Sequence, residues 1–258
     1  MSRQAQDRDF VTALARGLSI LQSFTPERRE MGTAEIAARL GLPQSTVWRL
    51  CYTLQKLGFL EPSSSDKLCV GNAALTLGFA AMQSSDLAQY AFPLMEEMAL
   101  RYDMGLSLAV RYGGDMLLVQ RAAAPTTLQL NVRVGSRLPI VRSALGWAYL
   151  CSLGEEERRG VLREISVAHP EEYKTWLPKL SEVFDQYRRD GYSLALRAVH
   201  PAIHAVSIPL ATLPNKPPMA ISCAGVAEIA PIEKVLAEIV PELQALAAKL
   251  DAHRLYAN

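Results

Sequence analysis

Residues 33–52 read TAEIAARLGLPQSTVWRLCY, a stretch in which a helical pattern stops at Gly-Leu-Pro and begins again at once. Thr33 can cap a first helix, and Gly41 supplies the left-handed conformation that ends it. Pro43 suits the first turn of a second helix, where its missing N–H has no helical partner to lose. The abrupt stop therefore predicts two short helices that cross steeply, as in a helix-turn-helix.

The second of these helices, over residues 43–57, has an apolar side and a polar side. With about 100° of rotation per residue, the apolar side carries Val47, Leu50, Cys51, Leu54 and Leu57. A small Ala37 lets the two helices approach while Val47 fills their crossing, and Gly58 ends the second helix.

This geometry predicts that the opening turn of the second helix enters the major groove of DNA. The residues expected to contact DNA are Gln44, Ser45, Thr46, Trp48, Arg49 and Tyr52. The alternative is an ordinary three-helix subdomain whose polar face is only solvated. The Ala-Gly-Val spacing, the proline start and a following wing favour DNA binding over that alternative.

The flanking segments complete a winged helix-turn-helix. Upstream, over residues 10–24, apolar residues recur every three or four positions and predict a helix with one buried stripe of Phe10, Leu14, Leu18, Leu21 and Phe24. Downstream, residues 59–71 read as two short strands around a Ser-rich turn with Lys67 near its tip. Lys67, together with Arg3, Arg8 and Arg16, can contact DNA phosphates.

The composition is that of a globular protein in a reducing compartment. The chain has 258 residues, of which 50% are hydrophobic, and a net charge of +1, so any affinity for DNA depends on where the basic groups lie. The four cysteines are far apart and form no C-x-x-C, which argues against a disulfide framework or a zinc ribbon. The N-terminus lacks the apolar core of a signal peptide, and residues 68–85 are too polar to span a bilayer. We therefore expect a cytoplasmic protein without membrane contact.

Several motifs, in order along the chain, resemble the isocitrate lyase regulator (IclR) family of bacterial transcription factors. They are GTAEIAARLGLPQSTVWRLCYTLQKLGFLE, KLCVGNAALTLG, VGSRLPIVRSALGWAYL, GYSLALRAVHPAIHAVSIPL and MAISCAGVA. The resemblance implies a winged helix-turn-helix domain at 1–70, a linker helix used in dimerisation at 71–86, and a GAF-like effector-binding and oligomerisation domain at 87–258. It also implies homodimers or tetramers that bind operator DNA and a small metabolite and control catabolic operons.

The residues of the second domain by themselves predict an α+β fold. Helical periodicity covers 88–102, 145–153, 155–165, 177–191 and 231–250, the last with a kink at Pro241. Strand patterns cover 106–110, 116–122, 128–134, 204–211 and 218–226. One antiparallel sheet flanked by helices normally offers a single cleft near the end of the sheet.

The candidate polar anchors of that cleft surround the start of the 145–153 helix. Free backbone N–H groups after Ser143 can hold a carboxylate, and Arg142 can pair with the same anion. The resemblance implies contacts at the N–H groups of Ala144 and Leu145 and at Ser222. His204 and Cys223, on the strands that the resemblance places at the pocket, complete the predicted effector-binding set. The alternative is that Arg142 and Ser143 only cap a helix and that Ser222 is an ordinary strand serine.

The sequence departs from the pattern of family members that bind small oxo-acids. Where they carry an acidic residue and a cysteine, this chain has Ala195 or Leu196 and Ala205, and a second strand serine is replaced by Ala224. The pocket is therefore expected to be less polar, and to favour a larger apolar or aromatic carboxylate. Residues 120–139 also resemble the branch of the family that regulates aromatic catabolism.

Metal and enzyme chemistry find little support in the sequence. His200 and His204 lie four residues apart, with Cys223 on the neighbouring strand, but Pro201 and the strand-like flanks spoil the helical geometry that chelates zinc. No metal or cofactor is expected, and no hydrolase, phosphate-loop or dinucleotide motif occurs. The prediction is a ligand-responsive DNA-binding repressor or activator; a small-molecule-processing enzyme with an incidental helical module is the alternative.

Overall fold

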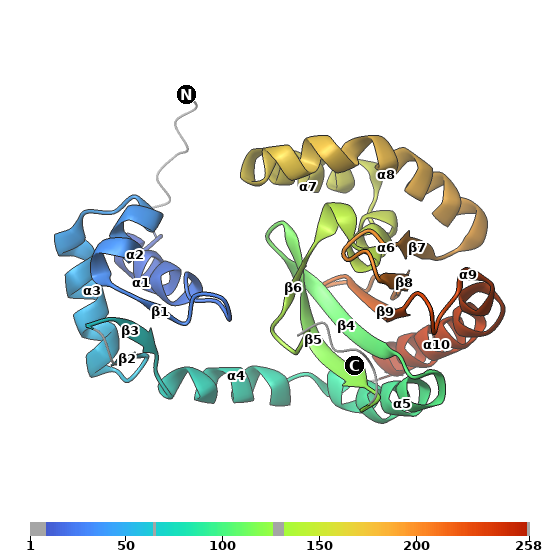
Figure 1. Cartoon of the computed structure of the whole chain (residues 1–258), viewed down its shortest axis with the longest axis horizontal. Helices are drawn as coiled ribbons and strands as arrows, with labels where there is room; N and C mark the ends of the chain where they lie inside the picture. Colours follow the sequence, from blue (N-terminus) through green and yellow to red (C-terminus); the bar gives the residue numbers. More distant parts are fainter. Residues whose placement is uncertain (1–8, 64–65, 126–131, 257–258) are drawn as a thin grey trace. The chain divides into compact units, whose positions relative to one another are not determined.

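The computed structural model describes residues 9–63, 66–125 and 132–256. The chain divides into two compact units, Met1–Ser84 and Ser85–Asn258, and each has a hydrophobic core of its own. Figure 1 shows the elements of both units.

The N-terminal unit is a helix-turn-helix with a small wing. Its described helices are α1 (Thr12–Gln22), α2 (Thr33–Leu40), α3 (Gln44–Lys56) and α4 (Ala73–Gln83). Its described strands form an antiparallel sheet in the order β1 (Glu30–Met31), β3 (Leu68–Val70), β2 (Leu60–Pro62). Strand β1 was not predicted, because two residues are too few to show a periodicity. Helices α1, α2 and α3 enclose a core of Ile20, Met31, Ile36, Ala37, Val47, Cys51, Leu60 and Leu68.

The turn between α2 and α3 has the predicted backbone. Gly41 is left-handed at φ 63°, and the N–H of Leu42 donates to the carbonyl of Ala37 at 3.1 Å. Ala37 and Val47 are both buried in the core where the helices cross. The structure thus places Ala37 and Val47 together between the two helices, as the sequence predicted.

Two details at the helix ends differ from the prediction. Thr33 was expected to cap α2, but it is the first helical residue, and the N-cap is Gly32 without a side-chain hydrogen bond. Pro43 is the N-cap of α3 and so lies one position before its first turn. Gly58 is left-handed at φ 74° directly after α3, as predicted.

The predicted buried stripe of α1 is wrong in its first half. Phe10, Leu14 and Leu18 are 61%, 62% and 48% exposed, whereas Gly17 and Ile20 are buried. The helix has apolar residues on two faces, and the core of the unit covers the face of Gly17 and Ile20, with Leu21 and Phe24 of the predicted stripe partly buried against it. Periodicity alone could not tell which face the rest of the unit would cover. Arg3 and Arg8 lie outside the described residues.

The C-terminal unit is built on one antiparallel sheet. The order of its described strands is β6-β5-β4-β9-β8-β7. Their bounds are β4 (Gly105–Tyr112), β5 (Asp115–Ala123), β6 (Arg137–Pro139), β7 (Ser193–Leu196), β8 (Ile203–Pro209) and β9 (Met219–Val226). The strand predicted at 128–134 is wrong where the structure describes it, because residues 133–136 form a turn with Gly135 left-handed at φ 88°. Residues 128–131 lie outside the described residues.

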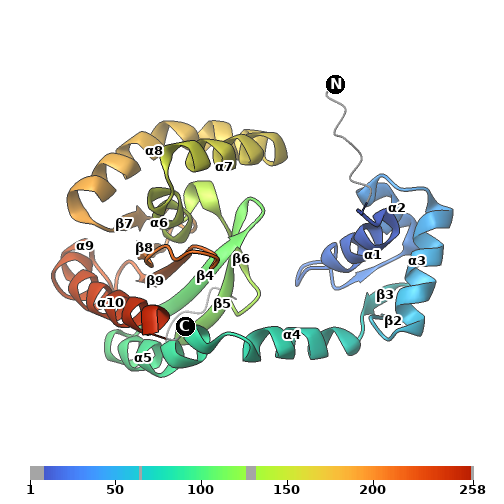
Figure 2. The ribbon, with the colours of Figure 1, turned by 180° about the vertical axis from the view of Figure 1, so that it is seen from behind.

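Helices cover both faces of this sheet (Figures 1 and 2). One face carries α5 (Asp86–Tyr102) and α10 (Val240–Tyr256), the latter preceded by α9 (Ile232–Lys234) and the π-helix η2 (Val235–Ile239). The other face carries the 3₁₀ turn η1 (Ile140–Arg142), α6 (Ala144–Ser152), α7 (Glu155–Ala168) and α8 (Pro170–Asp190). The predicted α+β class is confirmed. The irregularity predicted at Pro241 is the π-helix that ends two residues before it, since proline has no N–H to donate and its ring crowds the preceding turn.

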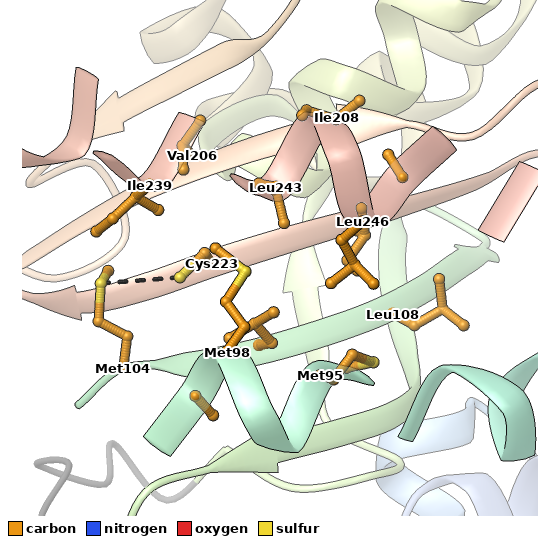
Figure 3. Close-up of a cluster of buried hydrophobic side chains, with 14 of the residues drawn as sticks. Met95, Met98, Met104, Leu108, Val206, Ile208, Cys223, Ile239, Leu243 and Leu246 are labelled. Atoms are coloured by element: carbon orange, nitrogen blue, oxygen red, sulfur yellow. Dashed lines mark hydrogen bonds between the residues drawn. The ribbon is translucent and has the colours of Figure 1, made fainter. Parts of the chain in front are cut away.

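The face beneath α5 and α10 is a dry apolar core (Figure 3). Met95 and Met98 from α5 meet Leu243 and Leu246 from α10 above the strands. Cys223 of β9 lies in this core, with its Sγ atom 3.7 Å from Sδ of Met104. Side chains on this face of the sheet therefore cannot reach the opposite face, where α6 lies.

Candidate DNA-binding surface and effector pocket

The opening turn of α3 is exposed, as a DNA-reading helix requires. Gln44, Ser45 and Arg49 are exposed and Thr46 is half-buried. On the inner side of the same helix, Val47 is fully buried in the core of the unit. The inner side thus fixes the helix while the predicted contact residues remain open to a partner.

Two aromatic side chains extend this surface along α3. Trp48 and Tyr52 are 58% and 50% exposed, and their rings stack with centroids 5.7 Å apart. The Lys56 ammonium lies 5.4 Å from the centre of the Tyr52 ring, within reach of a cation–π interaction. Large exposed aromatic rings on a surface helix, held in place by a neighbour, indicate a contact surface.

The wing supplies one further predicted contact. Lys67 is exposed at the start of β3, and its carbonyl accepts from the N–H of Ser63 at 2.8 Å, which closes the hairpin. Residues 64 and 65, at the turn itself, lie outside the described residues. A lysine in this place can reach a phosphate oxygen of bound DNA.

The C-terminal unit contains a pocket between its sheet and the start of α6. Its cavity has a volume of about 80 Å³. Its described lining is mostly apolar and comprises Ser107, Arg121, Val132, Leu138, Ser143, Ala144, Leu145, Val199, Ile203, Ala205, Ser222, Ala224 and Gly225. Four predicted residues, Ser143, Ala144, Leu145 and Ser222, are therefore brought together here.

The pocket lies over two adjacent rows that run across the strands. In an antiparallel sheet, directly paired residues point to the same face. One row of such pairs is polar and joins Arg121, Ser107, Ser222, Ser207 and Ser193. The next row is small and joins Gly105, Ala224, Ala205 and Ala195. The small side chains of the second row leave room for the pocket. The polar row provides hydrogen-bonding groups along one edge of the pocket.

Ser143 holds the start of α6 against the neighbouring turn. Its Oγ donates to the carbonyl of Pro139 at 2.7 Å and accepts from the N–H of Gly146 at 3.1 Å. A Cβ atom on Gly146 would lie 2.1 Å from the carbonyl oxygen of Ile140, so only glycine fits this close approach. The Ser143 hydroxyl is thus a helix cap, as the alternative reading held, and its residue also lines the pocket.

Three predicted effector contacts lie elsewhere. Arg142 is on η1, and its Nε atom lies 2.9 Å from Oε1 of Glu172 on α8. His204 pairs with Gly225 in the sheet and lies on the face opposite Ala205, with its Nδ1 atom 3.1 Å from the carbonyl oxygen of Ala230. Cys223 faces the apolar core, and burial raises its pKa to about 12. Each of the three contacts neighbours outside the described pocket lining, so the structure does not bring them together with the other four predicted contacts.

The structure also locates the histidine pair that raised the question of a metal. His200 is exposed, and its Nδ1 atom accepts from the N–H of Ala202 at 3.2 Å, whereas His204 is buried. Among the described residues, no group of three or more His, Cys, Asp or Glu side chains could hold a metal ion.

Arg121 is the residue that sequence reasoning missed. It lies on β5 directly opposite Ser107, and its Nη1 donates to Ser107 Oγ at 3.0 Å. Burial lowers the pKa of its guanidinium, which still carries its charge at neutral pH. The available signal was an arginine inside the apolar run MLLVQRAAA, where a solvated charge is not expected.

A helix-turn-helix with an exposed opening turn, on the same chain as an α+β unit with a polar-edged pocket, defines a ligand-responsive transcriptional regulator. The family models agree with this class. Residues 13–64 match the IclR helix-turn-helix domain, and residues 79–252 match the bacterial transcriptional regulator IclR C-terminal domain. The chain belongs to the IclR family.

Individual relatives are also regulators. The structure of an IclR family transcriptional regulator from Brucella abortus is 30% identical, covers 98% of this chain and 95% of its own, and superposes with a TM-score of 0.89. The HTH-type transcriptional regulator TsaQ1/TsaQ2 of Comamonas testosteroni is 25% identical over 96% of this chain and 90% of its own length. An IclR homolog from Microbacterium hydrocarbonoxydans, solved with 4-hydroxybenzoate, is 24% identical, covers 93% of this chain and 98% of its own, and has a TM-score of 0.71, which shows the same fold. The first two are named as transcriptional regulators and the third as an IclR homolog. In the part of the chain that is described, no helix is both long and apolar enough to cross a membrane.

Proposed function

We propose that this regulator controls a catabolic operon in response to an apolar or aromatic carboxylate bound in the C-terminal pocket. In this proposal α3 reads the operator through Gln44, Ser45, Thr46, Trp48, Arg49 and Tyr52, while Lys67 contacts a phosphate. The effector then alters the equilibrium between conformations that differ in operator affinity. The single observation that carries the proposal is the pocket, whose apolar lining is bounded by a polar row.

The lining supports an apolar effector. Ala205 and Ala224, which replace polar residues of the oxo-acid binders, lie side by side on the floor of the pocket. Val132, Leu138 and Ile203 add apolar walls. A small oxo-acid would leave most of these groups without a partner, whereas an aromatic ring would cover them. The Microbacterium complex shows that this fold accommodates an aromatic carboxylate.

The N-terminal unit supports assembly of a homo-oligomer. Leu75, Phe79 and Met82 on α4 are 70%, 65% and 50% exposed and recur at helical spacing. No residue of α4 is buried, so these side chains are not packed on the described part of the wing. A second copy of the chain would cover these side chains, and two-fold pairing implies a palindromic operator.

An operator titration tests the DNA-binding half of the proposal. Labelled DNA from the region upstream of the gene is titrated with wild type, with Arg49→Ala and with the control Arg163→Ala, which removes an exposed arginine from α7. Arg49→Ala is expected to lower affinity at least tenfold, while the control binds like wild type. Equal binding by Arg49→Ala would place the recognition surface elsewhere.

A further inference from the structure

The guanidinium of Arg121 is held in place by the sheet itself. Its Nη1 donates to Ser107 Oγ at 3.0 Å, and a Cβ atom on Gly105 would lie 2.7 Å from its Nη2. The group therefore lies flat against the backbone of Gly105, at the polar edge of the pocket. Any side chain at position 105 would overlap the guanidinium in this position.

This cation has no counter-ion among the described residues. No carboxylate forms an ion pair with it there, and the described residues of the pocket lining include no Asp or Glu. Burial lowers its pKa, and no neighbouring acid offsets that effect. Taking a cation out of water without a partner is costly, so such a site favours an anion that completes the pair.

We propose that Arg121 selects the charge of the effector, and that the pocket binds a monoanionic carboxylate through the guanidinium of Arg121 and the hydroxyl of Ser107. This inference rests on the proposed function, because it assigns the polar contact within the same pocket. The proposed anion therefore binds at Arg121 on β5, and not at Arg142, which is paired with Glu172. A guanidinium fork matches the two oxygens of one carboxylate.

The remaining lining explains why one negative charge suffices. Arg121 is the single charged side chain among the described residues of the lining. The apolar body of the ligand lies against Val132, Leu138, Val199 and Ile203, away from the polar row. A second carboxylate on the same ligand would enter this apolar part without a cation and would be excluded.

The inference is tested by comparing acids with their neutral amides. Binding of benzoate, phenylacetate, benzamide and phenylacetamide to the full chain is measured by calorimetry and by thermal shift. For the wild-type chain we expect at least one acid to bind and its amide to bind at least tenfold more weakly. The dianion phthalate is expected not to bind.

Three variants connect that preference to Arg121. Arg121→Met is expected to weaken binding of the acid at least tenfold and to abolish the preference over the amide. Arg121→Lys, which keeps the charge without the fork, should retain part of it. Arg133→Met is the matched control, because Arg133 is an exposed arginine outside the pocket.

Arg121→Met should also melt no lower than wild type, because it removes a half-buried charge without a partner. A marked loss of thermal stability would assign Arg121 a structural role and overturn the inference. Equal binding of acid and amide by wild type, or equal acid binding by wild type and Arg121→Met, would overturn it too, while the regulator function stands. If neither acid binds the wild-type chain, both the inference and the proposed effector class fail, and the operator titration still reports DNA binding independently.

Discussion

At the scale of single residues, the pocket depends on glycine and alanine, which have little or no side chain. Gly146 lets α6 begin directly against η1, and Gly105 gives the Arg121 guanidinium its place. The two alanines on the floor leave the volume that a ligand would fill. The space between a sheet and a helix is normally closely packed. Small residues at these positions therefore leave the room that the pocket and the Arg121 guanidinium occupy.

Gly146 offers a test of this close approach. Gly146→Ala would place a methyl group 2.1 Å from a backbone oxygen of Ile140. We expect the free energy of unfolding to fall by about 1–3 kcal/mol, because the backbone must move to relieve the overlap. Urea titration followed by circular dichroism measures the change.

The matched control is Gly160→Ala in the middle of α7, where an added Cβ meets nothing within 4 Å. Alanine is the better helix former, so this variant is expected to gain about 0.5–1 kcal/mol. If both variants lost stability equally, the loss at Gly146 could not be assigned to the contact with η1.

The residue scale also shows what sequence can predict of a site. Ser143, Ala144, Leu145 and Ser222, predicted as effector contacts from the helix start and the strand pattern, line one pocket in the structure. The sequence could not show whether Arg142 or Arg121 lines the pocket, because the position of each side chain depends on a partner far along the chain. Glu172 is 30 positions after Arg142, and Ser107 is 14 positions before Arg121.

At the scale of elements, long periodic segments were predictable and their packed faces were not. The α2-turn-α3 geometry followed from Gly41 and Pro43. The buried side of α1 did not follow, because two apolar faces compete and only the neighbouring helices decide between them. Which face of the sheet each strand residue occupies was equally hidden, so the sequence could not show that Cys223 and His204 lie on the face opposite Ala205.

The loop between β8 and β9 provides a test at this scale, because α10 fastens it. Arg254 is only 3% exposed, and its Nη1 donates to the carbonyl of Ala211 at 2.8 Å while Asp251 accepts from the Ala211 N–H at 2.8 Å. Arg254→Met removes charged donors from the carbonyls of Ala211 and Pro217, so the free energy of unfolding should fall by about 1.5–3 kcal/mol. Arg163→Met on the exposed side of α7 should change it little.

The pH dependence of this variant gives a second readout. Burial raises the pKa of Asp251, and the charge of Arg254 opposes that rise. Without Arg254 the pKa of folded Asp251 rises further above its unfolded value. A raised folded pKa in an acid means that stability is lower above this pKa and is recovered as the pH falls through it. The deficit of Arg254→Met should therefore shrink on acidification, and a deficit that grew would show that Asp251 is not coupled to Arg254.

At the scale of the whole molecule, the proposed function requires more than one copy of the chain. A single recognition helix contacts one half-site, and a pair of copies related by two-fold symmetry contacts two. The described residues leave an apolar stripe of Leu75, Phe79 and Met82 uncovered on α4. An uncovered stripe of this kind is typical of an interface, since a monomer gains nothing from exposing it.

Leu75→Glu combined with Phe79→Glu tests this assignment. The two charges would be buried in the interface without partners, so we expect the mass in solution to fall toward that of a monomer. Light scattering measures the mass, and an operator titration of the same sample should show at least a tenfold loss of affinity, because one half-site contact remains. Benzoate binding per chain should persist, since the pocket is built within one C-terminal unit.

Leu77→Glu is the control: Leu77 is 59% exposed on the opposite side of α4, and its substitution should leave mass and affinity unchanged. If the double variant kept the wild-type mass, the copies would associate through another surface, and the stripe on α4 would need a different partner.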